Sequence, residues 1–62
     1  METLETSWGT WWLFVDARLN GYGAAVDADM VVVEDTGDRE RNERLAHEAV
    51  RAWVIATGLG RA

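Results

Sequence analysis

The dipeptide Asn20-Gly21 lies between two segments in which apolar residues alternate along the chain. Asn-Gly favours a two-residue type I′ turn, because both central residues of that turn need a positive φ. A hairpin folded about this dipeptide sorts the flanking residues onto two chemically different faces. Its apolar face would hold the pairs Leu19–Tyr22, Ala17–Ala24, Val15–Val26, Leu13–Ala28 and Trp11–Met30. The sequence therefore predicts an antiparallel hairpin with one face suited to a hydrophobic core.

The opposite face of the predicted hairpin combines large aromatic side chains with carboxylates. An antiparallel sheet usually buries one face and exposes the other to water, yet the exposed face here would hold a tryptophan and a phenylalanine among three aspartates. Aromatic residues with charged surroundings are typical of protein interfaces. We therefore predict a partner-binding site on this face, made of Trp12, Phe14, Asp16, Arg18, Asp27 and Asp29.

Other roles of this face stay open from the sequence. The C-terminal helix, the N-terminal segment with Trp8 or a second copy of the chain could cover the aromatic residues, and the aspartates could form a solvated surface with no partner. The spacing of the aspartates matches no calcium-binding loop. We therefore predict neither a metal site nor another cofactor.

The short chain limits the core that the fold can bury. Sixty-two residues form at most one domain, and without cysteine neither a disulfide framework nor a thiolate zinc site adds stability. Residues 1–9 are polar and acidic and predict an N-terminal arm, either docked through Trp8 or formed into one helical turn. Residues 10–62 make the single domain. Four tryptophans are a large aromatic supply for it, so a homodimer or a tight complex is consistent with the composition.

Three strands are predicted in this domain. Residues 10–19 and 22–28 form the hairpin, and the β-branched run at 30–34 predicts a further strand. A turn at residues 27–29 would separate the second strand from the third. A lone hairpin is only marginally stable in water, so the three-stranded arrangement is favoured over one long second strand.

A helix is predicted after the third strand. Asp38 is a suitable N-cap, and Gly58 lies where a glycine would end the helix. Between them, spacings of three and four give one apolar stripe, made of Leu45, Ala49, Ala52, Trp53 and Ala56. The sequence therefore predicts a small two-layer α+β fold of β-β-β-α order, in which one C-terminal helix covers the apolar face of an antiparallel sheet.

The net charge of −5 lies in the part of the chain that is predicted to form the sheet. Residues 1–37 contain seven acidic residues against Arg18 alone, whereas residues 38–51 contain four acidic and four basic residues. An acidic sheet repels phosphate backbones and favours a basic protein partner, so we predict no direct binding to nucleic acid. The sequence shows neither a charged apolar leader nor a stretch long enough to span a bilayer, and we expect a cytoplasmic protein with no membrane partner.

Catalytic chemistry is not predicted. His47 and Ser7 are the only histidine and the only serine, and no nucleophile is placed beside the histidine for a hydrolytic triad. Gly21 and Gly23 precede a strand rather than a helix, so they do not form a phosphate loop. Paired carboxylates would need a cleft that a two-layer fold of this size hardly provides. We therefore expect a binding protein and not an enzyme.

Five segments of the chain occur in an order found in a known family: residues 11–15 (WWLFV), 20–23 (NGYG), 31–33 (VVV), 36–38 (TGD) and 43–50 (ERLAHEAV). Through them, residues 10–56 resemble the HicB-like antitoxin domain, a small and partly dsRBD-like fold. The family's usual Pro-Asp-Leu-Pro-Gly turn is replaced by Asp27-Ala28-Asp29, and the DNA-binding segment that many members carry after the helix is not seen. The resemblance implies an antitoxin domain that blocks its partner without binding an operator.

The resemblance and the acidic sheet together lead to one functional prediction and two alternatives. We predict a non-enzymatic, antitoxin-like inhibitor whose acidic aromatic face occupies a basic nucleic-acid-handling protein, such as a ribonuclease. The first alternative is a phage-encoded inhibitor of a host or CRISPR nuclease that acts by mimicry of nucleic acid. The second is a structural homodimer in which Trp12 and Phe14 form the interface.

Overall fold

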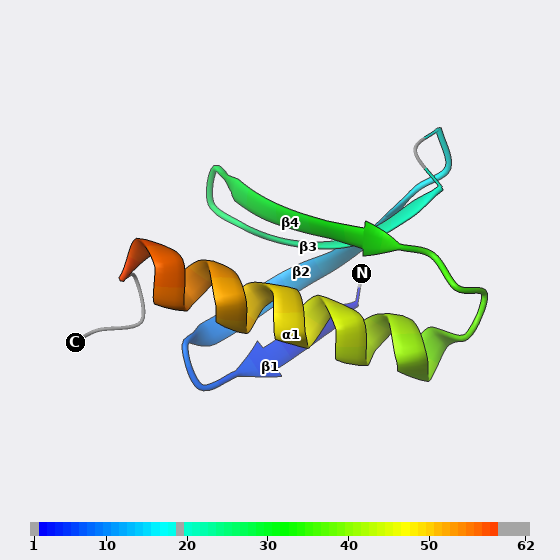
Figure 1. The fold of residues 1–62 in the computed structure, drawn as a ribbon. Helices are drawn as coiled ribbons and strands as arrows, with labels where there is room; N and C mark the ends of the chain where they lie inside the picture. Colours follow the sequence, from blue (N-terminus) through cyan, green and yellow to red (C-terminus); the bar gives the residue numbers. More distant parts are fainter. Residues whose placement is uncertain (1, 19, 59–62) are drawn as a thin grey trace.

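Four strands and one helix follow one another along the chain (Figure 1). The computed structural model describes residues 2–18 and 20–58. Each strand pairs antiparallel with the next, which gives the sheet order β1-β2-β3-β4. The elements are β1 (Thr3–Thr6), β2 (Gly9–Asp16), β3 (Gly21–Val26), β4 (Asp29–Glu34) and α1 (Arg39–Thr57). The predicted α+β fold, an antiparallel sheet with one C-terminal helix, is confirmed, and the sheet has one strand more than predicted.

The additional strand, β1, comes from the segment that was predicted to be an arm. Thr3 pairs with Trp12 and Thr6 with Gly9, so β1 and β2 form a tight hairpin. The hydroxyl of Thr6 accepts a hydrogen bond from the Trp8 N–H at 3.1 Å and donates one to the Gly9 carbonyl at 2.7 Å, and Gly9 takes a φ of 117°. The predicted helical turn is not formed, because Leu4 faces the core from a strand, whereas Trp8 packs against the core as the docking alternative expected.

The hairpin between β2 and β3 does not turn at Asn20-Gly21. Asp16 pairs with Gly21, and Gly21 lies in β3 without a positive φ, although Asn20 has a φ of 49°. The Asp16 carboxylate accepts a hydrogen bond from the Arg18 N–H at 3.0 Å. A hydrogen bond between an aspartate side chain and the backbone N–H two residues later forms an Asx-turn. The turn therefore begins earlier than Asn20-Gly21 predicts. The predicted pair that contains Leu19 lies outside the described residues.

The predicted faces survive this error in register. Val15 pairs with Tyr22 and not with the predicted Val26, a shift of four residues along β3. Because side chains alternate with a period of two, a shift by an even number leaves the residues of β2 and β3 on their predicted faces. Trp11, Leu13, Tyr22 and Ala24 are accordingly all buried. The hydrophobic alternation therefore placed these four core residues correctly although the turn was misplaced, whereas Val15 on the same face is 61% exposed.

The turn with two central residues is found between β3 and β4. Val26 pairs with Asp29, and Asp27 and Ala28 make the connection, with Asp27 at a φ of 52°. A turn at this place was predicted, whereas the pairs that extended β3 beyond it were wrong. Leu13 pairs with Ala24, not with Ala28, because β3 ends at Val26.

The ends of α1 match the sequence signals. The Asp38 side chain accepts a hydrogen bond from the Arg41 N–H at 3.3 Å, as an N-cap residue does. Gly58 takes a left-handed φ of 72°, and its N–H donates to the Val54 carbonyl at 2.8 Å. No helix in the described residues is long and apolar enough to cross a membrane.

The face of α1 that meets the sheet is not the predicted stripe. Ala52 and Ala56 are exposed, and Trp53 is half-buried, with its ring edge-on to Trp11 at 5.4 Å between centroids. The residues of α1 that are buried are Asn42, Ala46, Val50 and Val54. Their constant spacing of four keeps them on one side of the helix. The predicted stripe is rotated by about one residue from the buried one, and its members Leu45, Ala49 and Trp53 are half-buried beside it.

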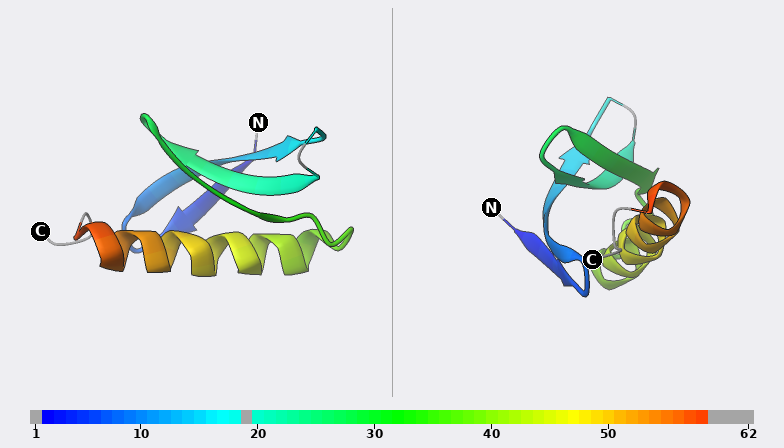
Figure 2. Two further views of the ribbon diagram at one scale, coloured as in Figure 1. Left: turned by 45° about the horizontal axis from the view of Figure 1, so that its top comes forward. Right: turned by 90° about the vertical axis from the view of Figure 1, so that its left-hand side faces the viewer.

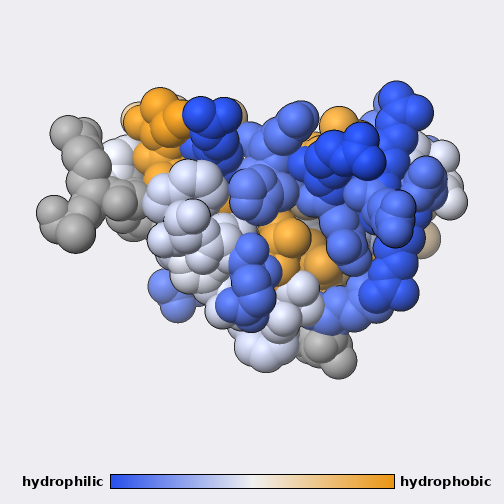
Figure 3. All heavy atoms as spheres, turned by 90° about the horizontal axis from the view of Figure 1, so that it is seen from below, coloured by the Kyte–Doolittle hydropathy of each residue, from blue (hydrophilic) through white to orange (hydrophobic). Residues whose placement is uncertain are grey.

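The helix crosses one face of the twisted sheet and leaves the other uncovered (Figure 2). We call these the inner face and the outer face. The core lies between the inner face and α1, where β2, β3 and the helix contribute Trp11, Leu13, Tyr22, Ala24, Ala46, Val50 and Val54. Seen from the helix side, the surface is mostly hydrophilic, with apolar side chains showing between polar ones (Figure 3).

Candidate functional site

The outer face is built from three rows of paired residues that run across the strands. The first row is Thr3, Trp12, Ala25 and Met30; the second is Phe14, Gly23 and Val32; the third is Asp16, Gly21 and Glu34. The alternation of side chains in a strand places these residues opposite the core residues. We call Trp12, Phe14, Ala25, Met30 and Val32 the apolar patch.

Large side chains of the apolar patch are open to solvent. The exposed fractions are 50% for Trp12, 62% for Met30 and 45% for Val32. They come from β2 and β4, on both sides of a β3 that contributes only glycine and alanine to this face. Tryptophan and methionine are enriched at protein interfaces relative to the rest of a surface. The outer face therefore has the composition of a contact surface.

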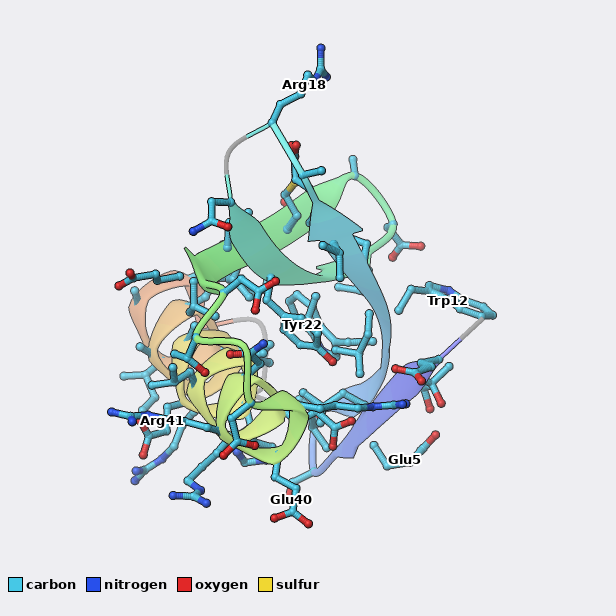
Figure 4. All side chains as sticks on the ribbon, turned by 90° about the vertical axis from the view of Figure 1, so that its right-hand side faces the viewer. Glu5, Trp12, Arg18, Tyr22, Glu40 and Arg41 are labelled. Carbon is cyan, nitrogen blue, oxygen red and sulfur yellow. The ribbon has the colours of Figure 1, made fainter. Side chains whose placement is uncertain are left out.

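Phe14 lies lower than its neighbours in the patch because Gly23 leaves room for it. A Cβ at Gly23 would lie 2.6 Å from Cε1 of Phe14 and closer still to Cζ, so the ring occupies the space above the glycine. This position makes Phe14 half-buried, while Trp12 projects away from the body of the molecule (Figure 4). Trp12 is therefore the more accessible of the two aromatic residues.

Carboxylates lie at the margins of the apolar patch. Asp16 and Glu34 stand on either side of Gly21 in the third row. At the β1 side, Glu5 accepts a hydrogen bond from the Thr10 hydroxyl at 2.8 Å. Arg18 is exposed in the loop after β2 and extends away from the sheet (Figure 4). The described margin is thus mainly acidic, with a single cation at the tip of the loop.

The structure brings together only part of the predicted site. Trp12, Phe14 and Asp16 share the outer face as predicted. Asp27 lies in the turn between β3 and β4, and Asp29 pairs with Val26, whose side chain is on the inner side of the sheet. Asp27 and Asp29 were therefore wrongly grouped with the aromatic residues. The turn at Asp27-Ala28 ends β3 and starts β4, and the Val26–Asp29 pair places Asp29 on the same side of the sheet as Val26.

Three residues of β4 were not predicted on this face: Met30 was assigned to the apolar face opposite Trp11, and Val32 and Glu34 were assigned to neither face. Met30, Val32 and Glu34 follow one another at every second position of β4 and complete the three rows. The run at residues 30–34 does not alternate between apolar and polar residues, so its faces could be assigned only after the turn at Asp27-Ala28 had been fixed. The run was predicted only as a β-branched strand, without an assignment of its faces.

Neither the helix nor Trp8 covers the outer face. Trp8 lies against His47 of α1, with 6.0 Å between ring centroids, so the N-terminal hairpin meets the helix on the inner side. Among the described residues, no group of three or more His, Cys, Asp and Glu side chains is placed to hold a metal ion.

A polar network joins the end of β4 to the start of α1. Asn42 is buried and accepts hydrogen bonds from the Thr36 N–H at 2.9 Å and the Thr36 hydroxyl at 2.7 Å. Its side-chain N–H donates to the Asp35 carboxylate at 2.8 Å, which also accepts from the Gly37 N–H at 2.9 Å. The Gly37 N–H and, second, the Asn42 amide lower the pKa of Asp35 below its usual range. The network fixes the loop that enters the helix.

The lowered pKa of Asp35 makes part of the stability dependent on pH. Its contribution is present above the pKa of an unfolded aspartate, about 3.9, and is lost as the pH falls through the lower pKa of the folded state. Asp35→Asn keeps an acceptor oxygen but does not titrate. We expect the stability of the wild type to fall more steeply than that of the variant below about pH 4, measured by urea unfolding with tryptophan fluorescence. Parallel pH curves for the two proteins would contradict this account.

Comparisons with known proteins were made for the whole chain. No family model, no curated protein and no solved structure matched it. The segments that carry the resemblance to the HicB-like antitoxin domain lie in β2, β3, β4, the following loop and α1, in chain order. The membership of that family stays a prediction from these segments.

Proposed function

We propose that the protein is a non-enzymatic inhibitor that binds a basic, nucleic-acid-handling protein, such as a ribonuclease, through the outer face of its sheet. The observation that carries this proposal is the apolar patch, in which Trp12, Met30 and Val32 are each about half exposed or more. Exposed contiguous apolar patches with a polar margin mark interaction sites in small proteins. Trp12, the largest side chain of the patch, is the anchor residue.

The charge of the face supports a basic partner. The chain carries a net charge of −5, and Asp16, Glu34 and Glu5 lie at the margin of the apolar patch. Proteins that bind nucleic acid present basic surfaces, and complementary charge speeds association with such a surface. The acidic margin would thus take the place of phosphates, in an antitoxin or in a phage-encoded nuclease inhibitor alike.

Replacing Trp12 and Met30 together tests the patch. We expect Trp12→Ser with Met30→Ser to weaken binding to the partner at least about 100-fold, because two exposed anchors are each worth about 2 kcal/mol or more at an interface. The measurement is isothermal titration calorimetry with a small basic ribonuclease, taken from the adjacent gene if that gene encodes one. Ile55→Ser is the matched control, since Ile55 is equally exposed but lies on α1.

Two results would contradict the proposal. The first is an association rate that does not fall as salt is raised from about 0.05 to 0.5 M, because steering by exposed charges is screened over this range. The second is a wild-type dimer that the double replacement converts to monomers in sedimentation experiments while partner binding is unchanged. That outcome would assign the apolar patch to a second copy of the chain.

A further inference from the structure

The hydroxyl of Tyr22 is buried and has no hydrogen-bond partner among the described residues. Tyr22 is only 5% exposed, and its ring belongs to the core between the inner face and α1 (Figure 4). Buried hydroxyl groups in native proteins almost always have a partner. A partner from outside the described residues is therefore expected at this atom.

A pocket of about 350 Å³ lies beside this residue, at the end of the sheet where α1 begins. This volume is at the lower end of the range for small-molecule sites, roughly 300–1,000 Å³. Its polar lining consists of Tyr22, Asp35, Asn42, Glu2 and Arg39. None of these residues belongs to the apolar patch, so the pocket is separate from the outer face and does not depend on what that face binds.

The charges around the pocket favour a cation. Arg39 is already paired with Glu2 and, at 3.4 Å, with Glu43. Burial raises the pKa of the Tyr22 hydroxyl, and the negative charges of Glu43 and Asp35 raise it further. Tyr22 is thus neutral at physiological pH and can accept a hydrogen bond in an acidic setting.

We propose that this pocket binds an organic cation that carries N–H donors, a guanidinium or a primary ammonium group. One N–H would donate to the Tyr22 hydroxyl and another to the Asp35 carboxylate, and both residues line the same pocket. The group could come from a free small molecule or from the side chain of a bound protein. Both sources present the same chemistry to the site.

Ionisation of Tyr22 provides a direct test, because it is the only tyrosine of the chain. The ultraviolet absorbance of tyrosinate therefore reports this hydroxyl alone. We expect N-ethylguanidinium to shift the midpoint of ionisation to lower pH, because a cation beside the oxygen favours its charged form. Tetramethylammonium at the same concentration has no N–H donor and is expected to leave the midpoint unchanged. Equal shifts with both cations would overturn the proposal.

Tyr22→Phe separates a ligand site from a structural role. Without its unpaired hydroxyl, the free variant is expected to unfold about 4–8 °C higher than the wild type. Its affinity for N-ethylguanidinium, followed through the amide resonances of Gly37 and Asn42, is expected to fall at least about tenfold. A lower unfolding temperature would overturn the proposal, because it would show that water already satisfies the hydroxyl in the free protein.

Two further comparisons identify the role of the charge and the source of the ligand. Asp35→Asn keeps the side-chain oxygen that accepts the hydrogen bonds of the loop but removes the negative charge, so we expect it to weaken N-ethylguanidinium binding. Asp29 is an exposed acid outside the pocket, and we expect Asp29→Asn to leave this binding unchanged. A blocked Gly-Arg-Gly peptide that causes the same resonance shifts would indicate a protein side chain as the source. Binding of N-ethylguanidinium alone would indicate a free small molecule, and binding of neither would overturn the proposal.

Discussion

Trp11→Ala is expected to leave a large fraction of the molecules unfolded at room temperature. Trp11 is 1% exposed, is among the largest fully buried side chains, and its ring meets Trp53 edge-on. Truncation of a buried tryptophan to alanine costs about 3–5 kcal/mol. A domain of 62 residues has a total stability of roughly 3–9 kcal/mol, at about 0.05–0.15 kcal/mol per residue. Circular dichroism during urea unfolding measures the loss.

The neighbouring residue supplies the control for this prediction. Trp12 has the same side chain one position along β2, but it points to the outer face and is half exposed. We expect Trp12→Ala to change the free energy of unfolding by less than about 1 kcal/mol, as is usual for surface positions. Equal destabilisation by the two replacements would show that the outer face is covered in solution, contrary to the arrangement of the layers.

The two adjacent tryptophans also show why the faces could be predicted from sequence. The alternation of apolar and polar residues has a period of two, and the face of each residue depends only on this parity. The misplaced turn shifted β3 by four residues, so Trp11, Leu13 and Tyr22 stayed on the core side and Trp12 and Phe14 on the other. A shift by an odd number would have reversed every assignment.

Turn position could not be predicted as well, because local signals competed. Asn20-Gly21 has the strongest intrinsic preference for a two-residue turn, but the Asp16 carboxylate binds the Arg18 N–H and starts the turn earlier. The short turn that joins β3 and β4 uses Asp27 at a positive φ, which is uncommon for residues other than glycine. The position of neither turn can be predicted from the propensity of a single dipeptide.

The candidate site depended on these turns. The site residues of β2 were assigned to the correct face because they precede the misplaced turn. Asp27 and Asp29 were wrongly assigned to this face because β3 was extended past its end at Val26. Met30, Val32 and Glu34 joined the face only through the register of β4. The Tyr22 pocket has no sequence signal, because it depends on the packing of the loop at Asp35 against the sheet.

Gly23→Ala is expected to destabilise the protein by about 1–3 kcal/mol, the usual cost of an extra group in a well-packed site. Gly23 lies in the centre of β3 with an ordinary strand conformation, so the cost does not come from its φ. The added Cβ would lie 2.6 Å from Cε1 of Phe14 and 2.8 Å from the backbone oxygen of Val31. The aromatic ring can move, but the oxygen of the neighbouring strand is held by the sheet. Urea unfolding measures the effect.

A double-mutant cycle with Phe14→Ala separates the two contacts. Removing the ring relieves only the contact with Phe14, so Gly23→Ala should cost less in the Phe14→Ala background than in the wild type, while the contact with the Val31 oxygen still makes it destabilising. Equal costs in both backgrounds would show that the ring gives way freely. If the coupling is found, Gly23 determines how low Phe14 lies and hence how far Trp12 stands above it. The shape of the outer face then depends on a residue that has no side chain to offer a partner.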